Sequence, residues 1–210
     1  LVAALPKTPI RLIKCVHCFL PLPCSILGYT KNTYFMAQTV LITGGSSGIG
    51  FELAKLFAKD GCRLILVSKP ANELAEAKAA LKKQYPDVQV TTIQKDLTAA
   101  TAPEEVYAEV TTQGVRVQVL VNNAGFGAFG FLAENDINAE YNSILLNCGA
   151  LYKLTRLFLP DMIAQKQGRI LNVASVAAFQ PNPLLGVYGA TKAFVLSMTR
   201  ALRFEMREQK

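Results

Sequence analysis

The sequence is poor in charged residues and has no long uninterrupted apolar run. Charged residues make up 18% of its 210 positions and hydrophobic residues 51%, which argues against disorder and favours a well-buried globular domain. No stretch reaches the roughly 18 apolar residues that a membrane-spanning helix needs. Internal repeats and low-complexity tracts are also absent from the sequence. We therefore expect a cytoplasmic protein with a single core and no membrane partner.

Acidic residues are absent from residues 1–36, which contain Lys7, Arg11, Lys14 and Lys31. These basic residues supply most of the net charge of +7, because the rest of the chain holds 18 basic and 15 acidic groups, a net +3. A protein that binds nucleic acid carries its basic patch on the folded domain. We therefore expect no nucleic-acid partner.

The five cysteines follow no regular framework, and their odd number argues against a secreted disulfide scaffold. Cys15 and Cys18 are two residues apart, as in many zinc sites, and Cys24 follows them. A structural zinc site usually requires a second pair at a matching spacing. Because Cys62 and Cys148 are far apart in the sequence, we expect no metal site.

Residues 1–36 are largely apolar but are interrupted by Pro21 and Pro23, and they offer no clean signal-peptide cleavage site. The sequence from Met36, MAQTVLITGG, has the character of a natural protein start. We expect residues 1–36 to be an extension outside the fold. A targeting or interfacial segment is the alternative for this part of the chain.

Residues 37–210 alternate between short apolar runs and stretches with helical spacing, in the order β-α-β-α-β-α-β-α-β-α. This order predicts parallel strands joined by helical crossovers, hence a doubly wound α/β sheet of the Rossmann type. The predicted strands are Thr39–Thr43, Cys62–Ser68, Val88–Asp96, Val117–Asn122 and Gly168–Ser175. The predicted helices cover about residues 48–61, 71–85, 103–114, 137–165 and 187–202.

A glycine-rich turn, TGGSSGIG, joins the first predicted strand to the first predicted helix. Gly44, Gly48 and Gly50 permit a tight turn and a close approach of the backbone to a pyrophosphate, which the helix N-terminus attracts. Ser46 and Ser47 add hydroxyl groups. The spacing is G-x-x-x-G-x-G, unlike the usual Rossmann G-x-G-x-x-G, so a purely structural glycine turn is the alternative.

The second predicted strand ends at Ser68 and Lys69, and no carboxylate follows before Glu73. In dinucleotide-binding folds an acidic residue at this strand end binds a ribose 2′-hydroxyl, whereas a cation suits a 2′-phosphate. We therefore expect NADP as the cofactor, with NAD less favoured. The alternative is that Lys69 is an ordinary solvated lysine.

Tyr188 and Lys192 are four residues apart and so share one face of the last predicted helix. A free tyrosine side chain has a pKa near 10, and a nearby ammonium group makes a phenol more acidic. Such a pair is a reasonable general acid and base for a hydroxyl proton. Ser175, at the end of the fifth strand, and Asn147, inside the long helix, are expected near the same edge of the sheet.

These motifs together resemble the short-chain dehydrogenase/reductase family. The segments TGGSSGIG, DLT, NNAG, LLN, VAS and YGATK occur in the family's order, and the resemblance covers about residues 37–210. The sequence around residues 158–197 is most similar to the DltE-like bacterial branch. The resemblance implies a strand, a nicotinamide-closing segment and a substrate lid after residue 210, so we expect a C-terminally truncated member.

The resemblance also implies a role for each matching residue. Tyr188 would be the general acid and base, Lys192 would hold the nicotinamide ribose, Ser175 would polarise a carbonyl, and Asn147 would anchor a relay water. Asp96 would bind the adenine amino group with Leu97 behind it. The pyrophosphate would rest on Gly44, Ser46, Ser47, Gly48, Ile49 and Gly50. The remaining cofactor-lining residues would be Asn123, Ala124 and Gly125.

We expect from this an NADP-dependent oxidoreductase that interconverts a carbonyl and an alcohol. The alternatives are a cofactor-binding but non-catalytic protein, a methyltransferase and a sugar epimerase. The loop 179–186 and Phe126, Phe129 and Phe131 are expected to border the pocket and to favour an apolar substrate, although packing is the alternative for these aromatic residues. The family resemblance further implies a homodimer or homotetramer, formed by helix 137–165 and the Tyr188 helix.

Overall fold

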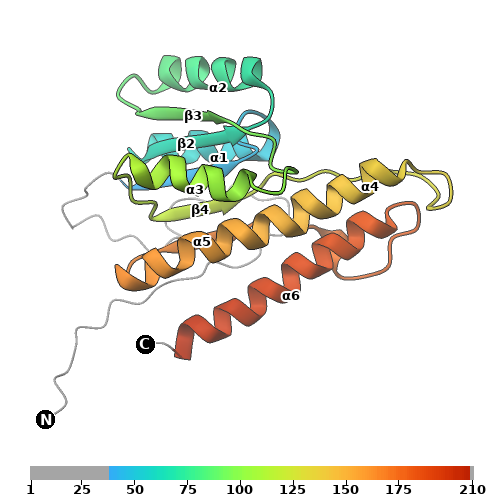
Figure 1. Ribbon diagram of the computed structural model, residues 1–210. Helices are drawn as coiled ribbons and strands as arrows, with labels where there is room; N and C mark the ends of the chain where they lie inside the picture. Colours follow the sequence, from blue (N-terminus) through green and yellow to red (C-terminus); the bar gives the residue numbers. More distant parts are fainter. Residues whose placement is uncertain (1–37, 209–210) are drawn as a thin grey trace, which may run out of the picture.

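The computed structural model describes residues 38–208 and contains a parallel five-stranded sheet in the order β3-β2-β1-β4-β5 (Figure 1). The predicted extension and its cysteine pair lie outside the described residues. The strands are β1 (Thr39–Thr43), β2 (Arg63–Ser68), β3 (Val90–Gln94), β4 (Val119–Asn122) and β5 (Arg169–Asn172). All four strand pairings are parallel, which confirms the predicted doubly wound sheet.

The helices follow the predicted order. They are α1 (Gly48–Lys59), α2 (Ala71–Gln84), α3 (Ala102–Thr112), α4 (Ile137–Ile144), α5 (Leu151–Ala164) and α6 (Gly186–Glu208). A π-helical turn, η2 (Leu145–Ala150), joins α4 to α5, and a short 3-10 turn, η3 (Val176–Ala178), precedes α6. No helix among the described residues is long and apolar enough to cross a bilayer.

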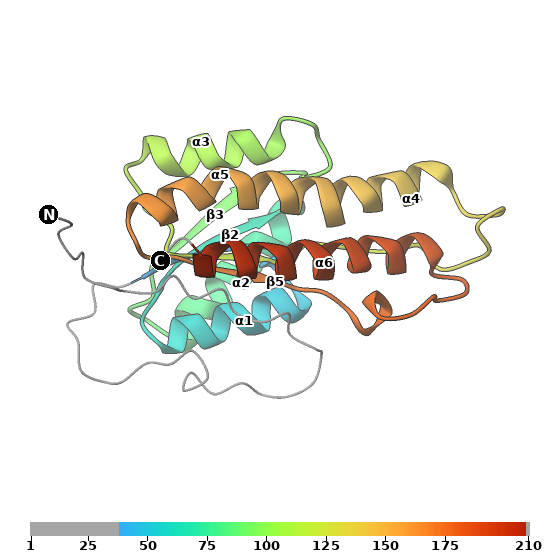
Figure 2. The ribbon, with the colours of Figure 1, turned by 90° about the horizontal axis from the view of Figure 1, so that it is seen from below.

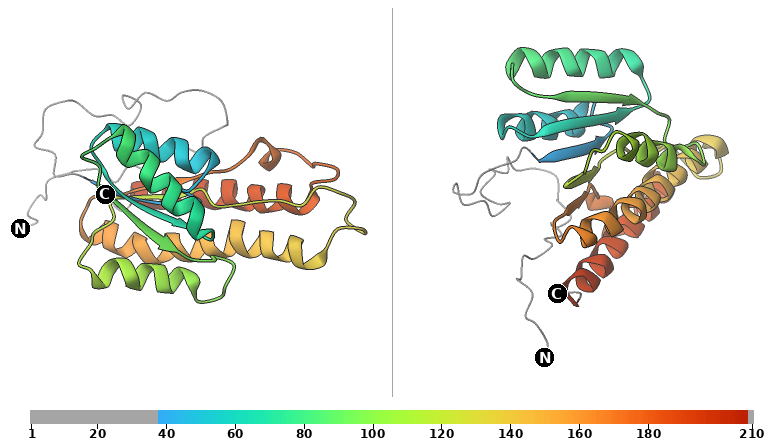
Figure 3. Two further views of the ribbon diagram at one scale, coloured as in Figure 1. Left: turned by 90° about the horizontal axis from the view of Figure 1, so that it is seen from above. Right: turned by 60° about the vertical axis from the view of Figure 1, so that its left-hand side comes forward.

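Each face of the sheet has its own apolar core, because neighbouring residues of a strand point to opposite faces. Val40 and Ile42 of β1 belong to the cluster that includes side chains of α1 and α2. Leu41, between them, belongs to the cluster that includes side chains of α3, α5 and α6. Figures 2 and 3 show this three-layer arrangement, in which α5 and α6 lie side by side.

The predicted helix 137–165 is one continuous helical run, but its centre is widened by the π-helical turn η2. Asn147 lies within this turn and is 1% exposed. Its amide Nδ2 donates to the Phe126 carbonyl at 2.8 Å and to Thr191 Oγ1 at 3.0 Å. Turns of this type often occur at functional sites, and here the turn directs a polar side chain into the space beside α6.

The apolar stripe predicted for the last helix is divided between the core and the surface. Val195 and Leu202 are buried, whereas Phe194 remains 41% exposed. Val195 packs with Leu151 and Ala174, and Met198 lies against this small cluster. The packing expected for the stripe is therefore confirmed for part of it.

Replacing Leu154 with alanine tests the core on the α5 side of the sheet. The side chain is 1% exposed and belongs to the cluster that includes β1 and α3. We expect Leu154→Ala to lower the free energy of unfolding by about 2–5 kcal/mol, because a buried cavity remains. Urea denaturation measures this loss. Arg156→Ala, at an exposed position of the same helix, should change it by less than about 0.5 kcal/mol, and equal losses in the two variants would contradict the assignment.

Candidate active site

The C-terminal ends of β1 and β4 are tied together by Thr43 and Asn123. Thr43 Oγ1 accepts from the backbone N–H groups of Asn123 and Ala124, both at 3.0 Å. Asn123 Nδ2 donates to the carbonyl oxygens of Thr43 at 3.0 Å and Gly44 at 3.1 Å. The sheet extends from β1 to β3 on one side and from β4 to β5 on the other, so the strand order reverses between β1 and β4. Folds of this type hold their ligands in the crevice at such a switch point.

The glycine turn that follows β1 requires bare backbone. Gly44 and Gly48 have φ angles of +61° and +52°, which L residues with a side chain rarely adopt. A Cβ atom on Gly50 would overlap the carbonyl oxygen of Gly44, so α1 can approach the turn only without one. These positions confirm a tight turn at the place where the sequence predicts one.

The N-terminus of α1 is open at this turn. Ser47 is the N-cap residue, but its side chain makes no capping hydrogen bond. Ser47 and Gly48 are exposed, and Ile49 is 50% exposed although its side chain is apolar. The first N–H groups of a helix attract anions when no cap occupies them. The residues present therefore fit the pyrophosphate group of a dinucleotide.

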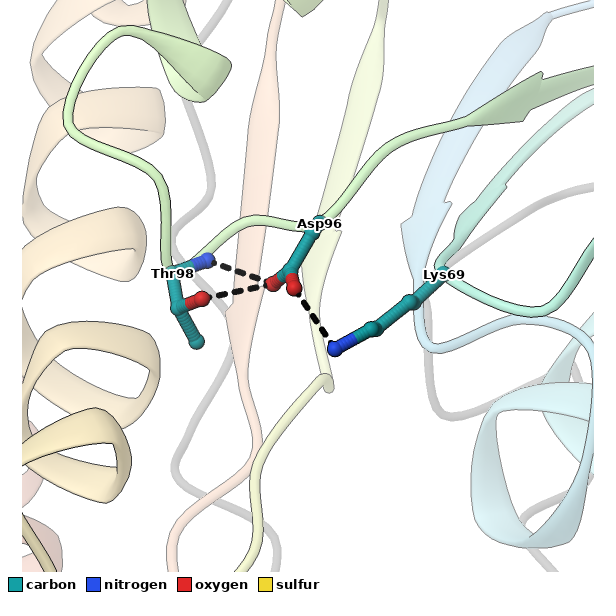
Figure 4. Close-up of polar contacts among 3 residues, drawn as sticks. All are labelled: Lys69, Asp96 and Thr98. Atoms are coloured by element: carbon teal, nitrogen blue, oxygen red, sulfur yellow. Dashed lines mark hydrogen bonds and ion pairs between the residues drawn. The ribbon is translucent and has the colours of Figure 1, made fainter. Parts of the chain in front are cut away.

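Lys69 follows β2, where dinucleotide-binding folds receive the adenosine ribose, and it forms an ion pair with Asp96 (Figure 4). The Lys69 Nζ atom is 2.8 Å from Asp96 Oδ2, and its side chain is 74% exposed. Thr98 donates to Asp96 Oδ1 from its backbone N–H at 3.0 Å and from its hydroxyl at 2.7 Å. Lys69 is therefore held at a defined place, and an ammonium with three donors retains capacity for a phosphate.

The hydrogen bond from Lys69 holds the pKa of Asp96 below its usual range, and the bonds from Thr98 act in the same direction. Burial opposes this shift because it disfavours the charged form. Leu97, which the family resemblance places behind Asp96, is 6% exposed and packs in the core on the α3 side. Asp96 is thus a carboxylate held by hydrogen bonds, two residues beyond the end of β3.

Lys192 and Asn147 meet at Gly125, in the loop that follows β4. A Cβ atom on Gly125 would lie 2.7 Å from Asn147 Oδ1 and 3.4 Å from Lys192 Nζ, so both side chains lie close to the bare backbone of this residue. Lys192 is 5% exposed, and its Nζ atom donates to the Val173 carbonyl at 2.9 Å. Asn147 Oδ1 accepts from the Phe126 N–H at 3.1 Å. The structure therefore brings these two predicted residues together.

Tyr188 belongs to the same cluster. The Lys192 Nζ atom is 5.7 Å from the centre of the Tyr188 ring. A Cβ atom on Gly127 would lie 2.6–2.8 Å from ring and Cβ atoms of Tyr188, so the loop after β4 packs directly on this tyrosine. The cluster places a phenol and a buried ammonium beside the crevice.

Ser175 lies beyond the strand in which the sequence predicts it. Strand β5 ends at Asn172, and Ser175 is the N-cap of the 3-10 turn η3, where its Oγ accepts from the Ala177 N–H at 3.2 Å. The hydrogen bond from Lys192 to the Val173 carbonyl ties α6 to the segment between β5 and η3. The predicted strand is too long because pairing with β4 stops at Asn172.

A buried ladder of polar side chains supports the site, and the sequence did not reveal it. Asn122 Nδ2 donates to Thr155 Oγ1 at 3.0 Å and to Asn172 Oδ1 at 2.9 Å. Asn172 Nδ2 donates in turn to Thr199 Oγ1 at 2.9 Å. These bonds join α5, β4, β5 and α6. The sequence did contain a signal for it, since two of the predicted buried strands contain an asparagine, Asn122 and Asn172.

The loops expected to border a substrate pocket are joined to each other. The Gly130 N–H donates to the Leu184 carbonyl at 2.9 Å. Phe126, Phe129 and Phe131 are 41%, 73% and 65% exposed, so the packing alternative does not hold for the last two. A hollow of about 600 Å³ lies between loop 177–183 and α6, but its lining includes neither Tyr188 nor Lys192.

A parallel sheet with an open glycine turn at its switch point, beside a tyrosine–lysine pair, defines the class of dinucleotide-binding oxidoreductases. The particular family follows from comparison with known proteins. The chain belongs to the short chain dehydrogenase family, whose model matches residues 38–210. Within residues 38–208 no group of three or more His, Cys, Asp or Glu side chains is placed to hold a metal ion.

Known relatives cover most of the chain. The very-long-chain 3-oxoacyl-CoA reductase of Bos taurus is 32% identical over 181 residues, which are 83% of this chain and 56% of the relative. A short-chain dehydrogenase from Sphingobium yanoikuyae in complex with NADPH is 35% identical, with a TM-score of 0.76 over 82% of this chain and 67% of that chain. L-Sorbose reductase from Gluconobacter frateurii, complexed with NADPH and L-sorbose, is 31% identical, with a TM-score of 0.76 over 82% and 65%.

The chain therefore spans about half the length of the curated relatives it matches. The family expected from the motifs is confirmed. The predicted membership of the DltE-like branch stays a prediction.

Replacing Lys69 with methionine tests its ion pair with Asp96. A carboxylate with a lowered pKa stabilises the fold above its unfolded-state pKa and loses that contribution as the pH falls through its folded-state pKa. In Lys69→Met we expect the pKa of Asp96 to rise, because the hydrogen bond from Lys69 is the largest cause of its lowering. NMR titration of the Asp96 carboxyl measures this change. Lys59→Met, at the exposed end of α1, is the control and should leave the titration unmoved.

Proposed function

We propose that the protein is an NADP-dependent oxidoreductase that interconverts a carbonyl and an alcohol. The observation that carries this proposal is the cluster of Asn147, Tyr188 and Lys192 around the bare backbone of Gly125 and Gly127. The same cluster lies at the carboxyl end of the sheet, where α/β folds of this type hold their ligands. The match to the short chain dehydrogenase family supports it and disfavours the methyltransferase and the epimerase.

The proposed reaction assigns one task to each side chain. A bound nicotinamide would supply or accept the hydride. In reduction Tyr188 would donate a proton to the carbonyl oxygen, and in oxidation it would accept one from the alcohol. Lys192, whose Nζ atom is 5.7 Å from the centre of the Tyr188 ring, would hold the nicotinamide ribose. Ser175 would hold the substrate oxygen through its hydroxyl.

Asn147 is assigned a positioning role in this proposal. Its side chain is held by the backbone of Phe126 and by Thr191 Oγ1, and Thr191 Oγ1 in turn donates to the Tyr188 carbonyl at 2.7 Å. These bonds connect the π-helical turn to the first turns of α6. Asn147 would thereby fix the loop after β4 against the helix that carries the tyrosine and the lysine.

NADP is the proposed cofactor because the exposed ammonium of Lys69 follows β2 and suits a 2′-phosphate. The NADPH complexes of the Sphingobium and Gluconobacter proteins support this choice. For the substrate we propose a ketone with an apolar part, since exposed Phe126 and Phe129 lie in the loop that packs on Tyr188. The 3-oxoacyl-CoA reductases among the relatives are consistent with such a substrate. Homo-oligomer formation and a cytoplasmic location stay proposals.

Replacing Tyr188 with phenylalanine tests the catalytic assignment. The variant keeps the ring that packs on Gly127 but loses the hydroxyl group. We expect turnover of a ketone panel with NADPH to fall about 10²–10⁴-fold, the usual contribution of a general acid. NADPH binding, measured by the fluorescence of the reduced nicotinamide, should stay within about twofold of the wild type because this ring is retained.

Tyr152→Phe is the matched control, because Tyr152 is 52% exposed on α5, and its turnover should be unchanged. If Tyr188→Phe turns over the ketones at the wild-type rate, the catalytic assignment is wrong. Binding of NADPH with no turnover of any ketone by the wild type would instead favour the non-catalytic, cofactor-binding alternative.

A further inference from the structure

Ser46, Ser68 and Glu73 form a hydrogen-bonded cluster between the glycine turn and the end of β2. Ser46 Oγ is 2.8 Å from Ser68 Oγ and 3.0 Å from Glu73 Oε2. Ser46 is 9% exposed, and Glu73 lies half-buried in the first turn of α2. The end of β2 is the place where dinucleotide folds receive the adenosine ribose. A carboxylate is therefore built into the part of the crevice assigned to that ribose.

The hydroxyl protons of this cluster point toward the carboxylate. A serine hydroxyl has one proton to donate, and an ionised carboxylate accepts only. Because Ser46 donates to Glu73, the bond between the two serines must be donated by Ser68. In this arrangement neither hydroxyl has a proton left for a phosphate oxygen. The cluster is an acceptor site, which matches a 2′-hydroxyl and opposes a 2′-phosphate.

The charges around the cluster act in the same direction. Lys69 is the cation that follows β2, and its ammonium is already paired with Asp96 at 2.8 Å. The three charged groups Lys69, Asp96 and Glu73 therefore sum to one negative charge. A 2′-phosphate that enters here gains from Lys69 but also meets the carboxylate of Glu73, and nearby like charges repel each other.

We propose that Glu73 is a specificity-determining residue that limits the preference of this protein for NADP over NAD. Its carboxylate accepts from the 2′-hydroxyl of NAD(H), whereas a 2′-phosphate requires Glu73 to release Ser46 so that the serine hydroxyl turns to the phosphate. Lys69 thus favours NADP, whereas Glu73 favours NAD. This inference rests on the proposed dinucleotide binding and does not depend on turnover.

The test is a fluorescence titration of the 210-residue protein with NADPH and with NADH, comparing wild type with Glu73→Gln. Glutamine keeps the shape and the acceptor oxygen but removes the charge. We expect NADPH to bind about fivefold more tightly, the effect of about 1 kcal/mol from one partly exposed charge. NADH binding should change by less than about twofold, because the amide still accepts from a hydroxyl.

Two further measurements separate this role from a general effect of charge or packing. The gain in NADPH affinity should be smaller at high salt, because salt screens the repulsion between Glu73 and the 2′-phosphate that the substitution removes. Glu76→Gln removes the same charge from an exposed position of the same helix and should leave the ratio of the two affinities unchanged. Glu73→Ala removes the acceptor as well and should weaken NADH binding.

The possible failures are distinguishable. If wild type binds both dinucleotides but Glu73→Gln leaves their affinity ratio unchanged, or changes it no more than Glu76→Gln does, this proposal is wrong and the proposed function stands. If wild type binds neither dinucleotide, the proposed function and this proposal are both wrong.

Discussion

The hydrogen bonds between Thr43 and Asn123 hold together the two strand ends on which the site is built. One threonine hydroxyl accepts from two backbone N–H groups of the loop after β4. One asparagine amide donates to two carbonyl oxygens, at the last residue of β1 and the first residue of the turn. The glycine turn and the Gly125 loop therefore have a fixed relation to each other. The dinucleotide crevice and the tyrosine–lysine cluster both depend on that relation.

A second constraint comes from buried polar side chains, which leave the helices little freedom to shift. Asn122, Asn172, Thr155 and Thr199 bond to one another across two strands and two helices. Breaking such a ladder would leave buried donors without partners, which costs more than each bond contributes. Asn147, which lies nearer the site, is a further buried polar side chain that is held by hydrogen bonds. The proposed general acid thus stands on α6, a helix fixed by hydrogen bonds on several sides.

The order of strands and helices followed from apolar runs and helical spacing, and the glycine turn followed from its motif. Strand ends were less well predicted. The fifth strand stops at Asn172, because its pairing with β4 ends there, and this leaves Ser175 outside it. Several contacts at the site join residues that are far apart in the sequence. Lys69 and Asp96 are 27 positions apart, as are Ser46 and Glu73. Asn147 and Thr191 are 44 positions apart. No local pattern encodes such contacts.

The amino-acid sequence by itself determined the parallel α/β architecture, the place of the phosphate-binding turn and the identity of the tyrosine–lysine pair. These features depend on local periodicity, on glycine conformations and on spacing along one helix. Only the tertiary structure decided which partner each polar side chain takes. Strand pairing and helix packing bring distant groups within hydrogen-bond distance, and most buried polar groups bond to a group that the fold places beside them.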